Sequence, residues 1–262
     1  NFAGSNHFAM DGFFDEMTSF RNWFFQGCFC ATGGTIVSGA MAERTKLKGF
    51  ATFTVLMTSI IYPVVIWWGW SGGGWLAYTN EAGEFVSSVG PALKDFAGSG
   101  LVHMVGGMGA IVGAIIVGPR TGRWDPSKES DFEGHSIPFC VLGTLFLWFG
   151  WYGFNPGSTL SMSTKDAANL AGIVAVNTTL SPCVAGLLVF FLRAVVLPPR
   201  LLDVGGFCNG ILAGLVSITA PCGFVKPWEA IIIGFIGGLV YQGTSMLMKK
   251  VKVDDVVDAF AV

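Results

Sequence analysis

The chain has 262 residues, of which 52% are hydrophobic and only 12% are charged, and its mean hydropathy is +0.60. A soluble domain usually carries about 25% charged residues, so this composition excludes an ordinary soluble protein. The net charge of −2 gives no indication of a nucleic-acid partner.

Seven uncharged runs are near or above the roughly 20 residues that a helix needs to cross the hydrocarbon core of a bilayer. They cover residues 24–42, 49–70, 96–118, 136–164, 167–192, 204–225 and 230–248. An eighth run begins near Val256, shortly before the sequence stops. The runs predict an all-α membrane protein, a polytopic helical bundle of about seven spans and the start of an eighth. We expect residues 1–262 to form a single membrane domain.

Aromatic side chains gather where the first run begins and the second ends. F-Q-G-C-F-C occupies residues 25–30, and W-W-G-W occupies residues 67–70. In most membrane proteins such side chains form an aromatic belt at the interface. A ring face also attracts a cation by about 0.5–2 kcal/mol, so Phe29 and Trp70 are alternatively candidates for a cation site.

The third run holds one titratable ring, in D-F-A-G-S-G-L-V-H over residues 95–103. His103 lies about eight residues into the run, or about 12 Å along a helix, near the middle of the membrane. At that depth a polar ring costs free energy unless it is paired or faces a cavity, which makes it a functional candidate. The alternative is a structural histidine bonded to a neighbouring helix.

Asp95 stands where the same run begins. A carboxylate at a helix start caps free N–H groups and suits the positive end of the helix dipole. Capping is compatible with a second role, in which the carboxylate makes an outer vestibule attractive to cations.

The fourth run contains G-W-Y-G-F-N-P-G-S over residues 150–158, which adds Trp151, Phe154 and Ser158 to the same side of the membrane. An aromatic cage with a hydroxyl suits a small cation that needs few oxygen ligands, and it suits sodium poorly. No nucleophile–base constellation or metal-binding spacing occurs, so we expect neither an enzyme nor a metal or cofactor site.

Two further patterns concern packing rather than chemistry. Six cysteines are spread through apolar runs without the spacing of a zinc site or a disulfide framework, which predicts small buried side chains. Glycines recur at four-residue spacing, which predicts close approach of helices in the bilayer. They are Gly109 and Gly113, Gly206, Gly210 and Gly214, and Gly234 and Gly238.

The basic residues set the orientation. The loops after the first, third, fifth and seventh runs hold eleven of the fifteen Lys and Arg residues, and the other loops with the N-terminal segment hold four. Because basic loops stay in the cytoplasm, residues 43–49, 119–135, 193–203 and 249–254 are predicted to be cytoplasmic. The N-terminus and the loops at 71–95, 157–166 and 221–229 are predicted to be outside.

D-F-A-G-S-G-L-V-H and the glycines after it resemble the signature of the ammonium transporter family, the Amt/Mep/Rh proteins. Further blocks match in the family's order, namely F-Q-G-x-F, G-A-M-A-E-R, G-W-Y-G-F-N-P-G-S, A-G-L-V-x-I-T-x-x-C-G and V-D-D-V-V-D-A-F. The resemblance runs from about Phe24 to Val262, and Trp70 places it closer to the Amt branch.

The resemblance implies a membrane protein of eleven helices that assembles as a homotrimer, with one pore in each subunit for ammonium or ammonia and for methylammonium as an analogue. It also implies a bilayer location, in the plasma membrane, and no nucleic-acid partner. The outer ammonium site resembles Trp70, Phe29 and Ser158, and Asp95 resembles the carboxylate that shapes it. The two phenylalanines that close the pore resemble Phe29 and Phe154. His103 resembles the first of two pore histidines, Trp151 the tryptophan beside them, and Thr219 a residue that lines the pore.

In physical terms, the aromatic vestibule would hold the cation and the imidazole would take or pass a proton, since histidine titrates near neutral pH. By the same resemblance the sequence is a partial one. We expect two helices before it and, directly after Val262, the second pore histidine.

Three alternatives remain open. The same fold serves as an ammonium sensor, with transport secondary, and as an Rh-type gas channel that passes NH3 or CO2 without charge. The Rh-type members tend to lack the tryptophan-based cation site, so Trp70 favours the Amt side. A seven-helix receptor is disfavoured, because the seventh run has no lysine for a retinal and an eighth run begins.

Overall fold

A computed structural model describes residues 10, 14, 19–77 and 92–262 of the chain. The described part is almost entirely helical, and its one β-bridge joins Ala77 to Leu93. The predicted N-terminal segment and much of the predicted loop at 71–95 lie outside the described residues.

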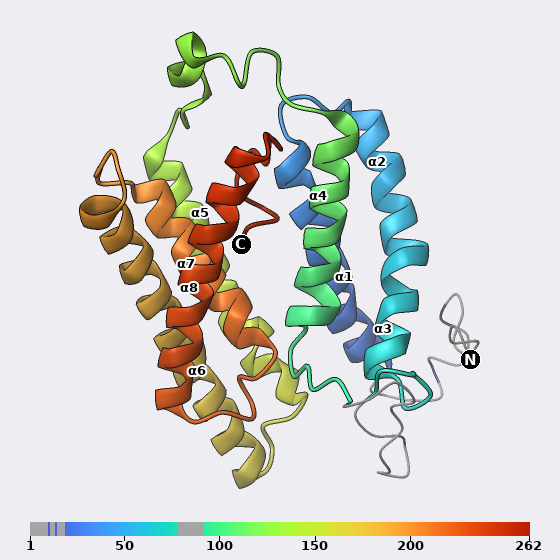
Figure 1. Cartoon of the computed structure of the whole chain (residues 1–262). Coiled ribbons are helices and arrows are strands. Elements are labelled where there is room, and N and C mark those ends of the chain that lie inside the picture. Colours follow the sequence, from blue (N-terminus) through green and yellow to red (C-terminus); the bar gives the residue numbers. More distant parts are fainter. Residues whose placement is uncertain (1–9, 11–13, 15–18, 78–91) are drawn as a thin grey trace.

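A first group of helices contains the first three predicted spans (Figure 1). The elements of this first group are α1 (Ser19–Met41), α2 (Leu47–Leu56), η3 (Met57–Ile61), α3 (Tyr62–Trp70), η4 (Ser99–Met104) and α4 (Val105–Val117). Two of these elements, η3 and η4, are π-helical turns that continue directly into α3 and α4. The predicted span 49–70 is therefore one rod with a π-helical turn in its middle.

A second group of helices, α5 to α8, lies beside the first (Figure 1). Its elements are α5 (Ile137–Phe154), η6 (Pro156–Thr159), α6 (Lys165–Phe191), η7 (Leu192–Val196), α7 (Val204–Thr219) and α8 (Pro227–Lys250). The loop between the groups carries the short 3₁₀ helix η5 (Pro126–Phe132).

Two helices end earlier than their uncharged runs. α5 ends at Phe154 and α7 at Thr219, whereas the runs continue to residues 164 and 225. Pro156 and Pro221 follow these ends, and a proline has no backbone N–H to donate to the carbonyl four residues earlier, so the helical hydrogen bonds stop there. α7 is consequently only 16 residues long.

Five helical rods among the described residues are long and apolar enough to cross a membrane. They are Leu47–Trp70, Ser99–Val117, Ile137–Thr159, Lys165–Val196 and Pro227–Lys250. The shorter α7 is also apolar, and α1 has 23 residues but lies outside this set of five. The structure thus confirms an all-α membrane protein, with a helix at each of the seven predicted spans.

The glycine patterns lie at helix contacts, as predicted. A Cβ on Gly214 of α7 would meet the Cα of Pro182 in α6 at 2.6 Å. On α8, Gly234 faces the backbone of Ser181 and Gly238 faces Ala185, both also in α6. Only a residue without a side chain permits such approach, so α6, α7 and α8 pack closely against one another.

Two expectations differ from the structure. Residues 251–262 form turns rather than the start of an eighth helix, with a single helical-type bond from the Val262 N–H to the Asp258 carbonyl. The cysteines were expected to be buried, but Cys28, Cys140 and Cys183 are exposed on helix surfaces. A cysteine on a lipid-facing surface meets the same apolar environment as one in the core, so composition does not separate the two.

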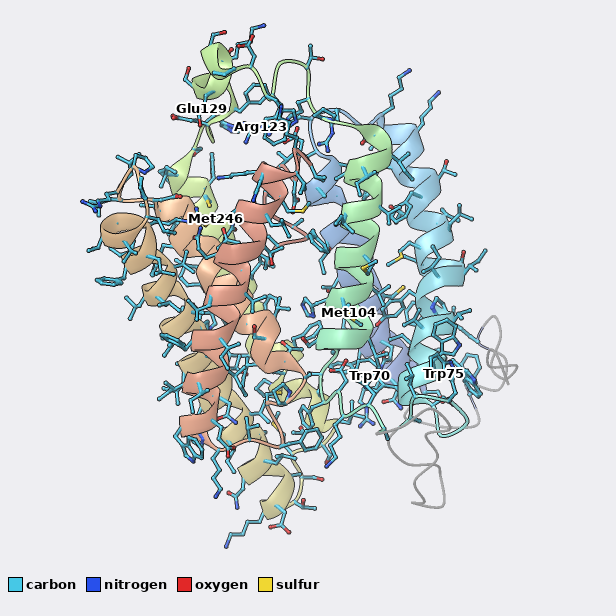
Figure 2. All side chains as sticks on the ribbon, viewed as in Figure 1. Trp70, Trp75, Met104, Arg123, Glu129 and Met246 are labelled. Atoms are coloured by element: carbon cyan, nitrogen blue, oxygen red, sulfur yellow. The ribbon has the colours of Figure 1, made fainter. Side chains whose placement is uncertain are left out.

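The predicted orientation gives a labelling test, because Figure 2 shows Arg123 and Glu129 at one end of the bundle and Trp70 and Trp75 at the other. We expect a cysteine at exposed Glu129 to react with a membrane-impermeant maleimide only after the cells are opened. A cysteine at exposed Met162, in the predicted outer loop, is the matched control and should react in intact cells. Reaction of the Glu129 position from outside would overturn the orientation.

Candidate functional site

An aromatic stack joins the two groups of helices at the end that carries Trp70. Phe29 of α1 stacks on Phe154 of α5, with ring centroids 3.9 Å apart and planes 16° apart. Trp70, the last residue of α3, meets Phe29 edge-on at 5.9 Å. Phe29 is 1% exposed, so the stack closes the bundle at this level.

Asp95 organises the turn that begins the third span. Its carboxylate accepts hydrogen bonds from the backbone N–H groups of four successive residues, Gly98 to Leu101, at 2.8–2.9 Å. These are free donors at a helix start, and a charged acceptor binds them more strongly than a neutral one. The backbone carbonyl of Asp95 also accepts the indole N–H of Trp70 at 2.7 Å. The side chain is therefore a cap, and the residue as a whole positions the Trp70 ring.

Gly98 is required at the bend of this turn. Its φ of +99° lies where side chains are strongly disfavoured, and a Cβ would meet Val102 Cγ2 at 2.6 Å. The Gly98 carbonyl accepts the backbone N–H groups of Val102 and His103, at 2.9 and 3.1 Å. The bend and the π-helical turn η4 together set the direction of the His103 side chain.

His103 has one ring nitrogen paired and one unpaired. Its Nδ1 lies 3.1 Å from the Gly98 carbonyl oxygen. Because a carbonyl oxygen only accepts, Nδ1 carries the proton of this bond, which leaves Nε2 of the neutral ring as an acceptor. Nε2 is buried and has no hydrogen-bond partner among the described residues. Buried polar atoms without a partner are rare in folded proteins, so this atom marks a candidate site.

The His103 ring lies against the aromatic side chains of α5. Its centroid is 5.2 Å from that of Trp151, in a stacked arrangement, and 5.5 Å from that of Phe154. The indole N–H of Trp151 donates to the Thr219 hydroxyl of α7 at 2.8 Å. Thr219 in turn donates to the Leu215 carbonyl at 2.7 Å, so a chain of hydrogen bonds fixes the surface on which the imidazole stacks.

Ser158 is linked to the aromatic stack only through the backbone of Phe154. It lies in η6, half-buried, and its hydroxyl donates to the Phe154 carbonyl at 2.9 Å. The predicted set of Trp70, Phe29 and Ser158 is thus joined through Phe154, which stacks on Phe29 and bonds Ser158. The lone pairs of the Ser158 oxygen remain able to accept a hydrogen bond.

A cavity of about 660 Å³ lies on the other side of His103 from the aromatic stack, between the two groups of helices. Most of its lining is apolar, including Met104, Leu147 and Phe260. Met104, labelled in Figure 2 at the start of α4, is 64% exposed. The few polar groups on its wall include Ser99 and Asn209, which the sequence patterns did not single out. The His103 ring therefore separates a closed aromatic stack from an apolar space.

Among the residues that the structure describes, no group of three or more His, Cys, Asp or Glu side chains could hold a metal ion. The chemistry of the site is that of aromatic faces, one imidazole and a few hydroxyls.

The cap at Asp95 predicts a large loss of stability for Asp95→Asn. The amide presents its NH2 to two of the four backbone donors, and each unpaired donor costs about 1–3 kcal/mol, or about 2–6 kcal/mol together. A denaturation midpoint measured in detergent should fall sharply. Asp166→Asn, in the first turn of α6, is the control and should leave the midpoint nearly unchanged. Equal midpoints for the two variants would contradict the capping role.

Sequence comparison relates the chain to known transporters. All 262 residues match the model of the Ammonium Transporter Family. Ammonium transporter 1 member 1 of Solanum lycopersicum is 40% identical over 267 residues, which cover 98% of this chain and 54% of the relative. The ammonium transporter Amt2 of Archaeoglobus fulgidus is 39% identical over 266 residues, covering 99% of this chain and 54% of the relative. The chain thus spans about half the length of the curated relatives it matches.

Solved structures agree with this relationship. A structure described as a sensor Amt protein superposes with a TM-score of 0.76 at 35% identity, covering 93% of this chain and 57% of the other. Mep2 of Saccharomyces cerevisiae superposes with a TM-score of 0.74 at 33% identity, covering 90% of this chain and 50% of the other. With the fold, the motifs and the matches in agreement, the chain belongs to the ammonium transporter family.

Proposed function

We propose that the protein carries ammonium or ammonia across the membrane, and that residues 1–262 form the part of the pore that holds its outer site and first histidine. One observation carries the proposal: Nε2 of His103 is a buried, unpaired acceptor between an aromatic stack and an apolar cavity. An N–H donor such as ammonium or ammonia is the natural partner of such an atom.

The aromatic stack supports recruitment of a cation at the end of α3. Trp70 is held by the Asp95 carbonyl with its ring beside Phe29, and its own ring face is available to attract a cation. Ser158 adds a hydroxyl oxygen near Phe154. In this proposal Asp95 acts by holding the turn and the Trp70 ring, since its carboxylate oxygens are occupied by backbone donors.

Passage beyond the stack requires loss of water or of charge. A bare cation in a low-dielectric space faces a penalty of at least several kcal/mol, whereas neutral ammonia faces far less. When an N–H bond of ammonium breaks and an N–H bond forms at Nε2 of His103, the products are ammonia and an imidazolium. The Gly98 carbonyl continues to accept the Nδ1–H in this state. We call this proton transfer the relay. It is compatible with transport of ammonia coupled to a proton and with net transport of ammonium.

The proposal includes a homotrimer in the plasma membrane, the arrangement that the family resemblance implies. Large apolar side chains of α5 that do not line the cavity, such as Phe146 and Phe149, are 67% and 77% exposed and suit lipid or a neighbouring subunit. The relatives compared are transporters or sensors by description, which supports a protein without an enzymatic reaction.

A sensor is the second candidate, because one similar solved structure is described as a sensor Amt protein. The two functions differ in flux. Uptake by the full-length protein in proteoliposomes, at a rate that depends on ammonium concentration, favours a transporter over a sensor in which transport is secondary.

Recruitment predicts a change in concentration dependence for Trp70→Leu in the full-length protein. Loss of a cation–π contact of about 1 kcal/mol should raise the half-saturating concentration of ammonium about fivefold and relax selectivity. Trp75→Leu is the matched control, because Trp75 lies at the same end of the bundle, is 40% exposed and packs on Trp68 (Figure 2). If Trp70→Leu leaves the concentration dependence unchanged, Trp70 belongs to an interfacial belt and not to a cation site.

The relay predicts that His103→Ala abolishes or uncouples transport while the protein still folds and assembles. Uptake of methylammonium and leakage of K⁺ should be measured in proteoliposomes and normalised to folded protein. Met104→Ala, at the neighbouring position on the same cavity wall, is the control and should retain uptake.

A purely structural histidine gives a different result. Its removal would take one of three hydrogen bonds from the Gly98 carbonyl, which keeps its two backbone donors, and lower stability by about 0.5–1.5 kcal/mol, with activity per folded molecule preserved. Normal uptake and normal selectivity in folded His103→Ala would therefore contradict a role for His103 in proton transfer.

A further inference from the structure

The last twelve residues, 251–262, which we call the C-terminal segment, run between the two groups of helices. Figure 1 shows the C-terminus lying between α8 and α4. Val257, Ala259, Phe260 and Val262 of this segment line the same cavity as His103. The segment is therefore a wall of the cavity, and what holds it in place also determines the shape of the cavity.

Asp254 anchors the segment to the first group. Its side chain is 2% exposed and accepts from Arg120 through Nε at 2.9 Å and through a second guanidinium nitrogen at 3.1 Å. The backbone N–H of Arg120 also donates to this carboxylate at 2.9 Å, and Arg123 Nε lies 3.3 Å away. Arg44, in the loop after α1, donates to the Asp254 carbonyl at 2.7 Å.

The surroundings of Asp254 keep this anchor charged. Burial by itself raises the pKa of the Asp254 carboxyl, but the hydrogen bonds and charge of Arg120 and the charge of Arg44 outweigh it. They hold the pKa below its ordinary value of 3.8, so the carboxylate is ionised at neutral pH. A buried, bidentate arginine–carboxylate pair fixes both position and orientation.

Asp258 anchors the same segment to the second group. Its carboxylate accepts from the Tyr241 hydroxyl and the Ser245 hydroxyl of α8, each at 2.9 Å. Arg193, in η7 at the end of α6, donates to the Tyr241 hydroxyl at 3.1 Å and to Gln242 Oε1 at 2.7 Å. The contact thus reaches two helices of the second group.

Asp255 shapes the chain between the two anchors. Its carboxylate accepts the backbone N–H groups of Ala259 and Phe260, at 2.9 and 2.8 Å. The span from Asp254 to Asp258 is therefore closed by its own hydrogen bonds, and its two ends cannot move apart freely.

We propose that Asp254, Asp255 and Asp258 form a brace that fixes the separation of the two groups of helices at the end with the basic loops, and with it the width of the cavity below His103. Asp254 and Asp258 are positioning residues in this proposal, since neither touches the cavity. The brace goes beyond the proposed function, because it would fix the width of the cavity whichever molecule enters.

The test measures opening of the cavity through the native Cys140, which lines it. A cysteine introduced by Met162→Cys, at an exposed position of the predicted outer loop, lies outside the cavity. The full-length protein in proteoliposomes is treated with a small water-soluble maleimide, and mass spectrometry gives the labelling rate of each cysteine. The rate at the Met162→Cys position serves as the internal reference.

Two brace variants are compared with matched controls. Asp254→Asn removes the charge of the first anchor, and Tyr241→Phe removes one hydroxyl of the second. Their controls are Asp131→Asn in an exposed loop and Tyr152→Phe, whose hydroxyl bonds Thr179. Each brace variant should raise the labelling of Cys140 relative to the Met162→Cys position about tenfold or more, the effect on an opening equilibrium of one lost hydrogen bond to a charged group. The controls should match the wild type.

A double substitution adds a second measure. Asp254→Asn combined with Arg120→Gln should label Cys140 no faster than the more affected single variant, because both remove the same pair. Wild-type labelling in folded Asp254→Asn and Tyr241→Phe would overturn the brace, and if Asp254→Asn fails to fold, the Tyr241→Phe pair decides alone.

The labelling result is independent of transport. Faster labelling of Cys140 in the brace variants of a protein that moves no ammonium would support the brace and overturn the proposed function. Unchanged labelling in a protein that transports normally would do the reverse.

Discussion

The site depends on one buried carboxylate that accepts four successive backbone N–H groups. Without Asp95, the donors at the start of η4 would face an apolar interior unpaired, and the bend at Gly98 would have nothing to hold it. The same residue holds Trp70 through its carbonyl, and the bend presents the Gly98 carbonyl to His103. A single local turn thus sets the aromatic surface on one side and the state of the imidazole on the other.

The two groups of helices meet at two levels. Near Trp70 they are joined by the stack of Phe29 on Phe154 and by hydrogen bonds such as that from the Ser99 hydroxyl to the Val216 carbonyl of α7. At the opposite end the contact is made through the C-terminal segment. The cavity lies between these levels, with the stacked aromatic rings at one end and the aspartates of the C-terminal segment at the other.

The sequence predicted the spans and the polar residue within them, because hydrophobic length and an isolated imidazole are local properties. It predicted that Asp95 caps a helix, but it did not predict the π-helical turn, nor the hydrogen bond to Asp95 from Trp70, which is 25 positions earlier. The ends of α5 and α7 were also predictable from the sequence, because Pro156 and Pro221 lie within the uncharged runs and mark where each helix ends.

The acidic residues of the C-terminal segment show where local patterns fail. In the sequence Asp254 is the last residue of the predicted cytoplasmic loop at 249–254, and nothing in that pattern indicates burial. Its burial results from Arg120, 134 residues earlier, and no local pattern joins the two. The prediction that the cysteines are buried fails for a related reason, because a lipid-facing helix surface and the protein core have the same apolar composition.

The packing of α6 restricts how this region can change during evolution. Gly214 of α7 and Gly234 of α8 both lie against the Ser181 carbonyl oxygen, and Gly210 and Gly238 both lie against the Ala185 carbonyl oxygen. The Ser181 hydroxyl adds a hydrogen bond to the Gly214 carbonyl at 2.8 Å. A larger residue at one of these glycines of α7 or α8 would push α6 outward, and α6 would then lose its close contact with the other helix as well. A change of residue size at one of these contacts therefore needs compensating substitutions in the other two helices.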